Sequence, residues 1–355
     1  MLVTSAHNSK IQLEHPIENQ KISNTYGPKI YISVIIIAYN RSNYIKAALD
    51  SVLNQSIERS KYEIIVVKNF KDSYIDNLKI DNFLNITVEN NDESPFGINL
   101  WRYGFSKSSG DIICFLEDDD IFYPNKLFEV VKAFSEYPSV GYIHNVFTIT
   151  IDFGQNIGHK FQRKYPIPNS TRLIRRRELR KNYNDLIKYN VDAHLSSINV
   201  KRQVLLPFEG KIPNVPGGFD GLVFYLFLAS DLDLLIYNKP LNTYRLHQKN
   251  NSKPKTYTEL LFYLSRLEIS AKMMLPILKE TDFEDIANAD LLYWSVKKEI
   301  SESIHRPKFR NLLIVLITLL KLRSKPLFYL ALIYIVYFFT NLSYYKFVNF
   351  KSVME

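Results

Sequence analysis

The stretch that decides the fold is "DIICFLEDDDIFYP", residues 111–124. An apolar run, Ile112–Leu116, passes directly into four acidic residues, Glu117–Asp120. Because adjacent carboxylates repel one another, they require either open solvent or a nearby cation. The stretch alone therefore allows two interpretations, a solvated loop that ends a strand or a group of cation ligands.

Further apolar runs precede this stretch and predict a sheet. "YISVIIIAYN" (31–40) and "YEIIVV" (62–67) are rich in β-branched residues without polar alternation, which is typical of strands buried on both faces. "NITVE" (85–89) is a third candidate strand, and "DIICFL" (111–116) is the next one.

Helical patterns separate these strands. "RSNYIKAALDSVLNQS" (41–56) repeats apolar residues on one helical face, with Ser42 or Asn43 as the expected N-cap. "NLWRYGFSKSS" (99–109) predicts a helix that stops at Gly110, and "PNKLFEVVKAFSEYP" (124–138) predicts another. The alternation indicates an α/β fold with a mixed, mostly parallel sheet. The acids then follow the carboxyl end of a buried strand, which is the edge where such sheets bind ligands.

The second half of the chain continues the pattern and divides it into segments. We expect strands in 140–151, 194–205 and 233–247, an apolar helix after the glycines of "GGFDG" (217–221), and helices over 258–302. The predicted division is a polar lead-in without a signal-peptide pattern (1–29), an α/β domain (30–255), a helical extension (256–305) and a basic, hydrophobic segment (306–355).

Composition narrows the class of protein. The chain has 355 residues, a formal net charge of +9 and 46% hydrophobic residues, so it can bury a large core. Its single cysteine, Cys114, excludes a disulfide framework and a cysteine-based zinc site, and it is expected inside a buried strand. The positive charge favours an anionic partner, but no nucleic-acid-binding module accompanies it, so no nucleic-acid partner is expected.

Five segments together resemble the family 2 glycosyltransferases, which are inverting enzymes with the GT-A fold. They are "VIIIAYNRSNYIKAALDSVLNQS", "YEIIVV", "SSGDIICFLEDDDIFYPNKL", "GGFDGLVFYL" and "PLNTYRLHQKNNS", which occur in the family's order over roughly residues 30–255. The resemblance implies transfer of a sugar from a nucleotide-sugar to a hydroxyl acceptor. The acidic cluster resembles the family's DXD motif, which holds a divalent ion, Mn²⁺ or Mg²⁺, on the donor diphosphate.

The resemblance assigns roles to the acids and to one histidine. Asp119 is the implied main metal ligand, while Asp118 faces the ribose or reaches the metal through water. Glu117 and His247 complete the implied metal set, and Asp120 is assigned to a helix start or to support of the ligands. The charge of the leaving group supports this assignment. A departing nucleoside diphosphate concentrates negative charge, and a hard divalent cation that prefers oxygen ligands neutralises it.

The remaining implied roles concern the base and the nucleotide. Asp220 matches the family's catalytic acid residue and would accept the acceptor's proton, although the same residue could simply cap the following helix. Arg245 would meet phosphate oxygens or make a surface ion pair. Ala38, Tyr39 and Asn40 occupy the family's nucleotide-facing position at the end of the first strand.

Two departures from the family pattern concern donor recognition. Where the family has "VVDDGS", this chain has "VVKNFKD", so Lys68 and Asn69 replace the acids that read the nucleotide base. Asn69 is the candidate to hydrogen-bond the base, with Asp72 as a substitute from further along. The family's basic residue before the metal-binding strand is also displaced, since Arg102 lies one position out of register.

The C-terminal segment predicts membrane association. "PLFYLALIYIVYFFTNLSYY" (326–345) is 20 residues long without a charge, close to the length that spans a bilayer. Residues 306–325 carry six basic residues and no acid, which places the catalytic side in the cytoplasm. A cell-membrane protein anchored through residues 306–345 is therefore expected. An in-plane or re-entrant hairpin and a buried soluble helix are the alternatives.

The basic run Arg172–Lys181 has two interpretations, a solvated helix face or a patch for a phospholipid head group or polyprenyl phosphate. Taken together, the sequence predicts a membrane-associated, metal-dependent glycosyltransferase that acts on a glycan or a polyprenyl-phosphate-linked acceptor. Two rivals stay open. One is a nucleotidyltransferase, which would need a glycine-rich loop that "AYNRSNYIK" lacks, and the other is a non-catalytic glycan-binding scaffold.

Overall fold

The computed structural model describes residues 30–88, 100–151, 166–247, 254 and 256–303. The lead-in over 1–29 and the expected membrane segment over 306–345 both lie outside these residues. Among the helices of the described ranges, none combines the length and the apolar character that crossing a bilayer requires.

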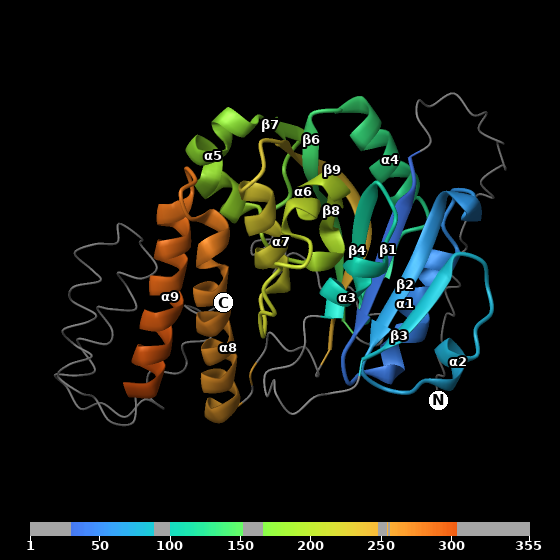
Figure 1. Cartoon of the computed structure of the whole chain (residues 1–355), viewed down its shortest axis with the longest axis horizontal. Helices are drawn as coiled ribbons and strands as arrows, with labels where there is room; N and C mark the ends of the chain where they lie inside the picture. The colour runs from blue at the N-terminus through green and yellow to red at the C-terminus, as the bar shows by residue number, and fades with distance from the viewer. Residues whose placement is uncertain (1–29, 89–99, 152–165, 248–253, 255, 304–355) are drawn as a thin grey trace, which may run out of the picture.

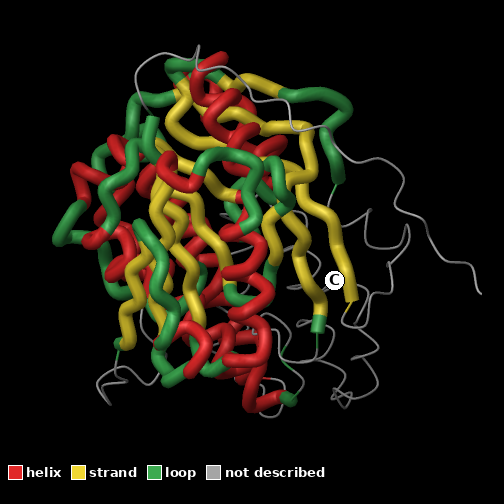
Figure 2. Tube along the Cα trace, turned by 90° about the vertical axis from the view of Figure 1, so that its right-hand side faces the viewer, coloured by secondary structure: helices red, strands yellow, loops and turns green. Residues whose placement is uncertain are grey.

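The described residues build one nine-stranded sheet with the order β3-β2-β1-β4-β8-β6-β9-β5, and β7 pairs with β9. The strands are β1 (Ile32–Ala38), β2 (Tyr62–Lys68), β3 (Phe83–Thr87), β4 (Ile112–Glu117), β5 (Ile121–Phe122), β6 (Val140–Ile151), β7 (Arg172–Ile174), β8 (Ile198–Lys201) and β9 (Asp233–Leu246). Figure 2 shows the strands running alongside one another as a twisted layer among the helices.

The helices account for most of the remaining described residues. They are α1 (Ser42–Leu53), α2 (Ser73–Asp76), α3 (Leu100–Lys107), α4 (Lys126–Glu136), α5 (Arg176–Lys188), α6 (Arg202–Leu205), α7 (Phe219–Leu228), α8 (Tyr257–Leu278) and α9 (Glu284–Ser303), with short 3-10 helices η1 (Arg59–Lys61), η2 (Leu195–Ser197) and η3 (Leu206–Phe208). Helices α8 and α9 lie side by side next to α7, on the far side of the molecule from β3 (Figure 1).

Two hydrophobic cores sandwich the sheet, because alternate residues of the central strands point to opposite faces. Ile35 and Phe115 face α3, α7 and the α8–α9 pair, whereas Val34 and Cys114 face α1 and α4. All seven residues of β1 are buried, which confirms the two-sided burial expected from its β-branched run.

The sheet is mixed, as expected: β1, β2, β3 and β4 form parallel pairs and β6 is parallel to β9, whereas β8 is antiparallel to β4 and to β6, and β9 is antiparallel to β5 and β7. One prediction about the fold was wrong, because Arg41 rather than Ser42 or Asn43 holds the N-cap position of α1, and Ser42 is already helical. The Arg41 side chain makes no capping hydrogen bond and contacts the acidic cluster instead.

Candidate active site

The site lies where β1 and β4 end side by side. The two strands are parallel, with Ile37 opposite Glu117, and the Asp118 amide donates to the Ile37 carbonyl oxygen at 3.0 Å. Consequently the residue that follows β1 and the acids that follow β4 meet at the same edge of the sheet. This arrangement brings Arg41 to Asp118 and Asp119 across 78 residues of sequence.

The acidic cluster is buried, which excludes the solvated-loop interpretation. Asp118, Asp119 and Asp120 are 0%, 5% and 1% exposed. Their charges are compensated inside the protein: Nη2 of Arg41 lies 2.5 Å from Oδ1 of Asp118, and Nη1 of Arg41 donates to Asp119. A carboxylate cluster out of solvent requires such positive partners because desolvation otherwise disfavours its ionised form.

His247 supplies the second partner of the cluster from the end of β9. Its Nε2 lies 2.9 Å from Oδ2 of Asp119, and its ring stacks on Tyr44 at 4.5 Å between centroids. The guanidinium of Arg245 lies 5.3 Å from the Tyr44 ring, while the Arg245 amide donates to Asp120 at 3.1 Å. The predicted residues Asp118, Asp119 and His247 are therefore brought together, with Arg245 beside them.

The electrostatics of the four acids separate Asp119 from its neighbours. Burial opposes ionisation of Asp119, but the hydrogen bond from His247 and the charge of Arg41 outweigh it and lower its pKa. Burial raises the pKa of Asp118 to about 8 and that of Asp120 to about 7, and it raises the pKa of Glu117 well above its usual range. Asp119 is thus the acid that the site keeps ionised, as a metal ligand must be.

The side chains at the site are of types that bind divalent metals. In this structure the positive charge beside Asp118 and Asp119 is the Arg41 guanidinium. Within the described ranges, no three His, Cys, Asp or Glu side chains gather as a metal-holding group. Both carboxylate oxygens of Asp118 are buried, and Oδ1 faces the Arg41 guanidinium at 2.5 Å. One carboxylate, one imidazole and an acceptor-rich neighbour fit Mn²⁺ or Mg²⁺, which complete their coordination with substrate phosphates and water.

The nucleotide-facing end of β1 is joined to the end of β2 by a pair of asparagines. The Asn40 amide donates to Oδ1 of Asn69 at 2.8 Å, and Nδ2 of Asn69 donates to Oδ1 of Asn40 at 2.8 Å. Ala38 is fully buried and Tyr39 packs on the sheet core, so the asparagine pair forms the polar tip of this edge.

The residues that replace the family's base-reading acids have structural partners. Lys68 is fully buried and lies 2.7 Å from Asp76, and Nζ also donates to Thr87 at 2.8 Å. Asp72 caps α2 by accepting the amide hydrogens of Tyr74 and Ile75. The Asp72 carboxylate is therefore engaged in the cap, which leaves Asn69 as the candidate for base recognition.

Asp220 occupies the first turn of α7 and does not cap that helix. Gly218 is the N-cap residue, with a φ of +65° that glycine adopts at little cost. The Asp220 carboxylate accepts the amide hydrogens of Gly221 at 3.0 Å and of His194 at 3.2 Å. Burial raises its pKa, and the neighbouring Asp192 has a pKa raised to about 7 by burial and by the charge of Asp220. A fixed carboxylate with a raised pKa is suited to accept a proton.

Lys126, a buried lysine that the sequence analysis did not single out, is linked to the acidic cluster through Ser196. Nζ of Lys126 donates to the Ser196 carbonyl oxygen at 2.6 Å and to Asn145 at 3.0 Å. The Ser196 hydroxyl in turn accepts the Glu117 amide hydrogen at 3.0 Å. Lys126 looks like an ordinary first-turn helix residue in "YPNKLFEV", so only its burial reveals this role.

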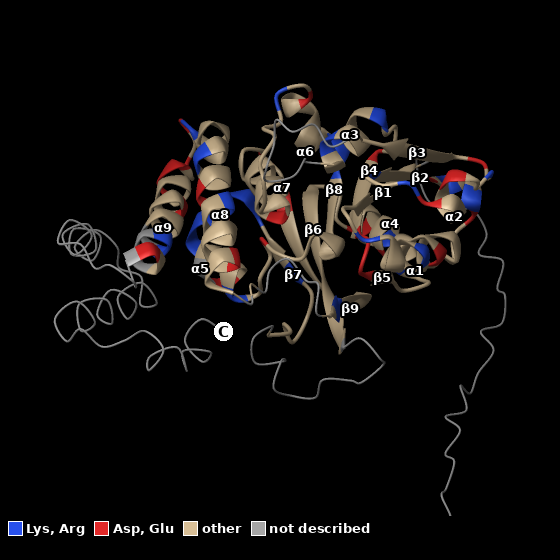
Figure 3. Cartoon of the chain, turned by 90° about the horizontal axis from the view of Figure 1, so that it is seen from below, with Lys and Arg blue, Asp and Glu red and all other residues tan. Residues whose placement is uncertain are grey.

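The basic run on β7 and α5 is engaged within the molecule. Arg175 pairs with Asp233 at 2.9 Å, and Arg180 pairs with Asp285 of α9 at 2.5 Å. Figure 3 shows charges of both signs on α8 and α9, whereas the central strands carry few. The first pair attaches the start of α5 to β9 and the second attaches α5 to the start of α9, so both arginines have partners within the molecule.

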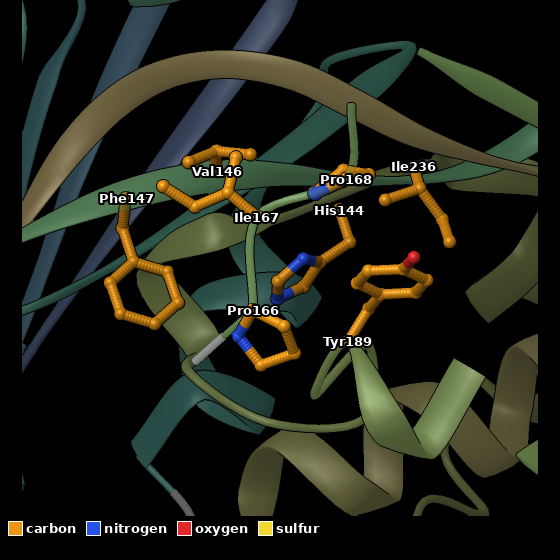
Figure 4. Close-up of a pocket in the computed structure, with 8 residues that line it drawn as sticks. All are labelled: His144, Val146, Phe147, Pro166, Ile167, Pro168, Tyr189 and Ile236. Atoms are coloured by element: carbon orange, nitrogen blue, oxygen red, sulfur yellow. The ribbon is translucent and has the colours of Figure 1, made fainter. Parts of the chain in front are cut away.

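A small hollow lies on the side of β6 and β9. Its lining is mainly apolar and includes Phe147, Ile167 and Tyr189, with the buried His144 at its floor (Figure 4). Nε2 of His144 donates to the Ala193 carbonyl oxygen at 3.0 Å, and burial lowers the pKa of the ring to about 4. His144 is therefore neutral at physiological pH and donates this hydrogen bond.

Part of the chain resembles known sugar transferases in sequence. Residues 33–198 match the model of Glycosyl transferase family 2. An uncharacterized glycosyltransferase of Nostoc sp. is 30% identical over 145 residues, which are 36% of this chain and 42% of that protein. The minor teichoic acid biosynthesis protein GgaA of Bacillus subtilis is 30% identical over 146 residues, covering 37% and 31% of the two chains. The alignments span less than half the length of these curated relatives.

Solved structures resemble the chain in fold. The crystal structure of S. aureus TarS 1–349 in complex with UDP-GlcNAc aligns with a TM-score of 0.56 and 12% identity, and covers 81% of this chain and 80% of that one. At this identity the likeness establishes the fold alone, an α/β GT-A-like mixed sheet flanked by helices.

Proposed function

We propose, from the premise that this chain belongs to glycosyl transferase family 2 through residues 33–198, that it transfers a sugar from a nucleotide-sugar donor to a hydroxyl acceptor with inversion. The observation that carries the proposal is the pairing of Asp119 with His247 at 2.9 Å, at the edge where β1 and β4 end. The charge of Asp220 contributes to the raised pKa of Glu117, so Asp220 acts electrostatically on the acidic cluster.

The donor would bind along the ends of β1, β2 and β4. The Asn40–Asn69 pair offers amide groups to the nucleotide base, and Arg245 offers a guanidinium to phosphate oxygens. The TarS complex with UDP-GlcNAc supports a nucleotide-sugar donor on this fold. Because Lys68 and Asn69 replace the family's acids, base selectivity would depend on the asparagine pair.

Asp119 and His247 would hold Mn²⁺ or Mg²⁺, with Asp118 beside them. When bound, such an ion neutralises the negative charge that develops on the leaving diphosphate. Arg41 would then leave Asp118 and Asp119 at least in part, because a guanidinium and a dication compete for the same carboxylates. The freed guanidinium would then be able to donate two parallel hydrogen bonds to phosphate oxygens of the donor.

Asp220 would act as the general base. Its carboxylate takes the proton of the acceptor hydroxyl as that oxygen forms a bond to the anomeric carbon, while the bond from that carbon to the diphosphate breaks. The hydrogen bonds from Gly221 and His194 orient the carboxylate before the reaction. A single displacement of this kind inverts the anomeric configuration.

The acceptor and the location follow from the sequence expectations. The acceptor would be a glycan or a polyprenyl-phosphate-linked saccharide, and residues 306–345 would hold the enzyme at the cytoplasmic face of the cell membrane. GgaA, one of the relatives, is named for minor teichoic acid biosynthesis, which supports a cell-surface glycan product.

The test is donor hydrolysis across a panel of UDP- and GDP-sugars with Mn²⁺ or Mg²⁺, comparing the wild type with Asp119→Ala. Asp81→Ala, which removes an exposed carboxylate away from the site, is the matched control. We expect metal-dependent turnover that Asp119→Ala abolishes and Asp81→Ala retains. A wild type that neither hydrolyses any donor nor binds any nucleoside diphosphate in the presence of metal would overturn the proposal and favour the non-catalytic scaffold.

A further inference from the structure

The loop that leads into Asp220 is bonded to α8, which lies beyond the residues that match the family model. We call Pro216–Gly218 the base loop. Nε of Arg266 on α8 donates to the Pro216 carbonyl oxygen at 2.9 Å, and Nη2 of the same guanidinium donates to the same oxygen. The Gly217 amide donates to Oγ of Ser270, one turn further along α8, at 3.1 Å. Two consecutive residues of the base loop are therefore attached to α8 just before Asp220.

The two glycines of the base loop bring its backbone directly against α8. A Cβ on Gly217 would lie 3.5 Å from both Nε and Nη2 of Arg266, and a Cβ on Gly218 would lie 3.5 Å from Cδ2 of Leu267. Both distances are those of van der Waals contact. The loop therefore packs on α8 along its length, in addition to the hydrogen bonds at its first two residues.

Burial strengthens the contact between α8 and the base loop. Pro216 and Gly217 are buried, Ser270 is 1% exposed, and Arg266 is half-buried. Oγ of Ser270 donates to the Arg266 carbonyl oxygen at 2.8 Å, which leaves the oxygen lone pairs for the Gly217 amide. Hydrogen bonds with a charged donor are stronger than neutral ones, and a buried carbonyl oxygen that loses its donor is destabilising. The loop therefore has a strong preference for this position on α8.

The second helix of the extension holds α7 on the other side of Asp220. The hydroxyl of Tyr225, a buried residue of α7, donates to Oδ2 of Asp290 on α9 at 3.1 Å. Helices α8 and α9 are joined in turn, since Lys298 of α9 pairs with Glu268 of α8 at 2.8 Å. Figure 1 shows α7, α8 and α9 as neighbours. The chain is thus attached to the extension both before and after Asp220.

The position of α7 decides whether Asp220 keeps both of its hydrogen bonds. Gly221 is its neighbour in the chain, so the bond from the Gly221 amide moves with the helix. The His194 amide belongs to a separate segment, so its 3.2 Å bond to Oδ2 of Asp220 requires the start of α7 to stay in place. A catalytic group displaced by about 1 Å can lose about 100-fold in rate. Contacts that fix the base loop therefore fix the carboxylate for the reaction.

We propose that Arg266 is a positioning residue, which holds the base loop together with Ser270 and so determines where the Asp220 carboxylate meets the acceptor hydroxyl. Arg266 acts through the backbone of Pro216. The proposal rests on the proposed function, and it deepens that function by making the helical extension a part of the active site.

Hydrogen–deuterium exchange of the full chain tests the loop contact by itself. Arg266→Met removes the charged donor, and Ser270→Ala removes the acceptor of the Gly217 amide. Lys298→Met is the matched control, because it removes an ion pair between α8 and α9. We expect peptides that cover Gly217–Gly221 to exchange about fivefold faster in the first two variants, the effect of one lost hydrogen bond on local opening. Unchanged exchange in β1 shows that the variants are folded.

The kinetic readout is hydrolysis of the UDP- and GDP-sugar panel with Mn²⁺. Water then replaces the acceptor, and its proton passes to Asp220 as its oxygen bonds to the anomeric carbon. We expect Arg266→Met to lower kcat about tenfold, with the donor KM and the Kd for UDP within about twofold of the wild type. Arg266→Lys still donates to the Pro216 oxygen and should keep kcat within about threefold of the wild type. Lys298→Met should keep the wild-type kcat.

Several results would overturn the proposal. Unchanged exchange of the base loop or an unchanged kcat in Arg266→Met would show that the base does not depend on α8. A raised donor KM at unchanged kcat would make Arg266 a donor contact, since its charge also acts on Tyr39 at the end of β1. An equal loss of kcat in Lys298→Met would indicate a general effect on the extension.

The wild type separates these results from failure of the proposed function. If the wild type hydrolyses a donor and Arg266→Met does so equally well, only the positioning role fails. If the wild type hydrolyses no donor and binds no UDP in the presence of Mn²⁺, the proposed function fails and the positioning role fails with it.

Discussion

Nε2 of His247 lies 2.9 Å from Oδ2 of Asp119, although 128 residues separate them in the sequence. The contact joins the ends of β4 and β9, which are separated in the sheet by β8 and β6. The contact therefore links Asp119, the acid that stays ionised, to the end of β9, the last strand of the α/β domain.

This contact predicts unequal losses of metal binding when either partner is changed. Asp119→Asn removes the ionised ligand and should abolish Mn²⁺ binding in the presence of UDP. His247→Gln removes the imidazole but leaves the charge of Asp119, so it should weaken Mn²⁺ binding by roughly 10–100-fold rather than abolish it. Titration of Mn²⁺ followed by electron paramagnetic resonance measures both, with Asp81→Asn as control. Equal Mn²⁺ affinity in the wild type and in Asp119→Asn would refute the assignment.

Replacing Arg41 is expected to have the opposite effect, an increase in the affinity for Mn²⁺. Because its guanidinium occupies Asp118 and Asp119 in the metal-free protein, Arg41→Met should raise the affinity for Mn²⁺ without nucleotide, by about tenfold for a change of about 1.4 kcal/mol. The same variant should lower the free energy of unfolding by about 3 kcal/mol, because buried carboxylates lose their partner. Urea titration with and without Mn²⁺ tests both effects, and added Mn²⁺ should restore stability. A lower Mn²⁺ affinity in Arg41→Met would show that Arg41 assists metal binding rather than competing with it.

Asp220 predicts an acid limb in the pH dependence of transfer. A general base works only when ionised, and burial raises the pKa of Asp220. The rate should therefore fall as the pH falls through a value above the ~3.9 of an unperturbed aspartate. Asp220→Asn should lower kcat by roughly 10²–10⁴-fold and leave UDP affinity unchanged. An acid limb that persists in the residual activity of Asp220→Asn would assign the titration to another group.

Replacing Arg180 is expected to lower the free energy of unfolding slightly and to leave the KM for the acceptor unchanged. The Arg180–Asp285 pair is partly exposed, so Arg180→Met should lower the free energy of unfolding by about 0.5 kcal/mol, less at high salt. Arg177→Met, an exposed neighbour on the same helix, is the control. Urea unfolding at two salt concentrations measures the difference. If Arg180→Met instead raises the acceptor KM at unchanged stability, the phosphate-patch interpretation returns.

Two glycines predict opposite effects of a single added methyl group. A Cβ at Gly110 would lie 2.7 Å from the carbonyl carbon of Ile32 and closer still to the Ser33 amide nitrogen, in the backbone of β1. Since this buried strand cannot retreat, Gly110→Ala should cost about 3 kcal/mol. A Cβ at Gly221 meets nothing within 4 Å, so Gly221→Ala should stabilise α7 by about 0.5 kcal/mol. Thermal unfolding compares the two, and similar melting temperatures would contradict the packing argument.

The local sequence pattern was sufficient to predict the strands that carry the site. The β-branched runs predicted β1, β2 and β4 within one or two residues, because burial on both faces leaves a clear apolar signal. The position of the acids after β4 placed them at the ligand edge of the sheet, since the carboxyl ends of parallel strands share one edge. The helical periodicity over 258–302 likewise anticipated α8 and α9.

Partners distant in the sequence were not predictable in this way. Nothing near Arg41 indicates that it would hold Asp118 and Asp119, and nothing near His194 indicates that its amide would meet Asp220. The N-cap of α1 was misassigned for the same reason, because Ser42 is a good capping residue and only the acidic cluster explains why Arg41 stands there.

The sequence by itself determined the α/β class, the order of its buried strands and the placement of acids at a ligand-binding edge, because these depend on residue patterns within a few turns or strands. Only the tertiary structure decided that the acids are buried, which of them stays ionised, and which backbone amides orient the proposed base. These properties depend on desolvation and on charges and side chains brought together from β1, β4, β6 and β9. Such contacts are created when the sheet assembles, so no local stretch of sequence records them.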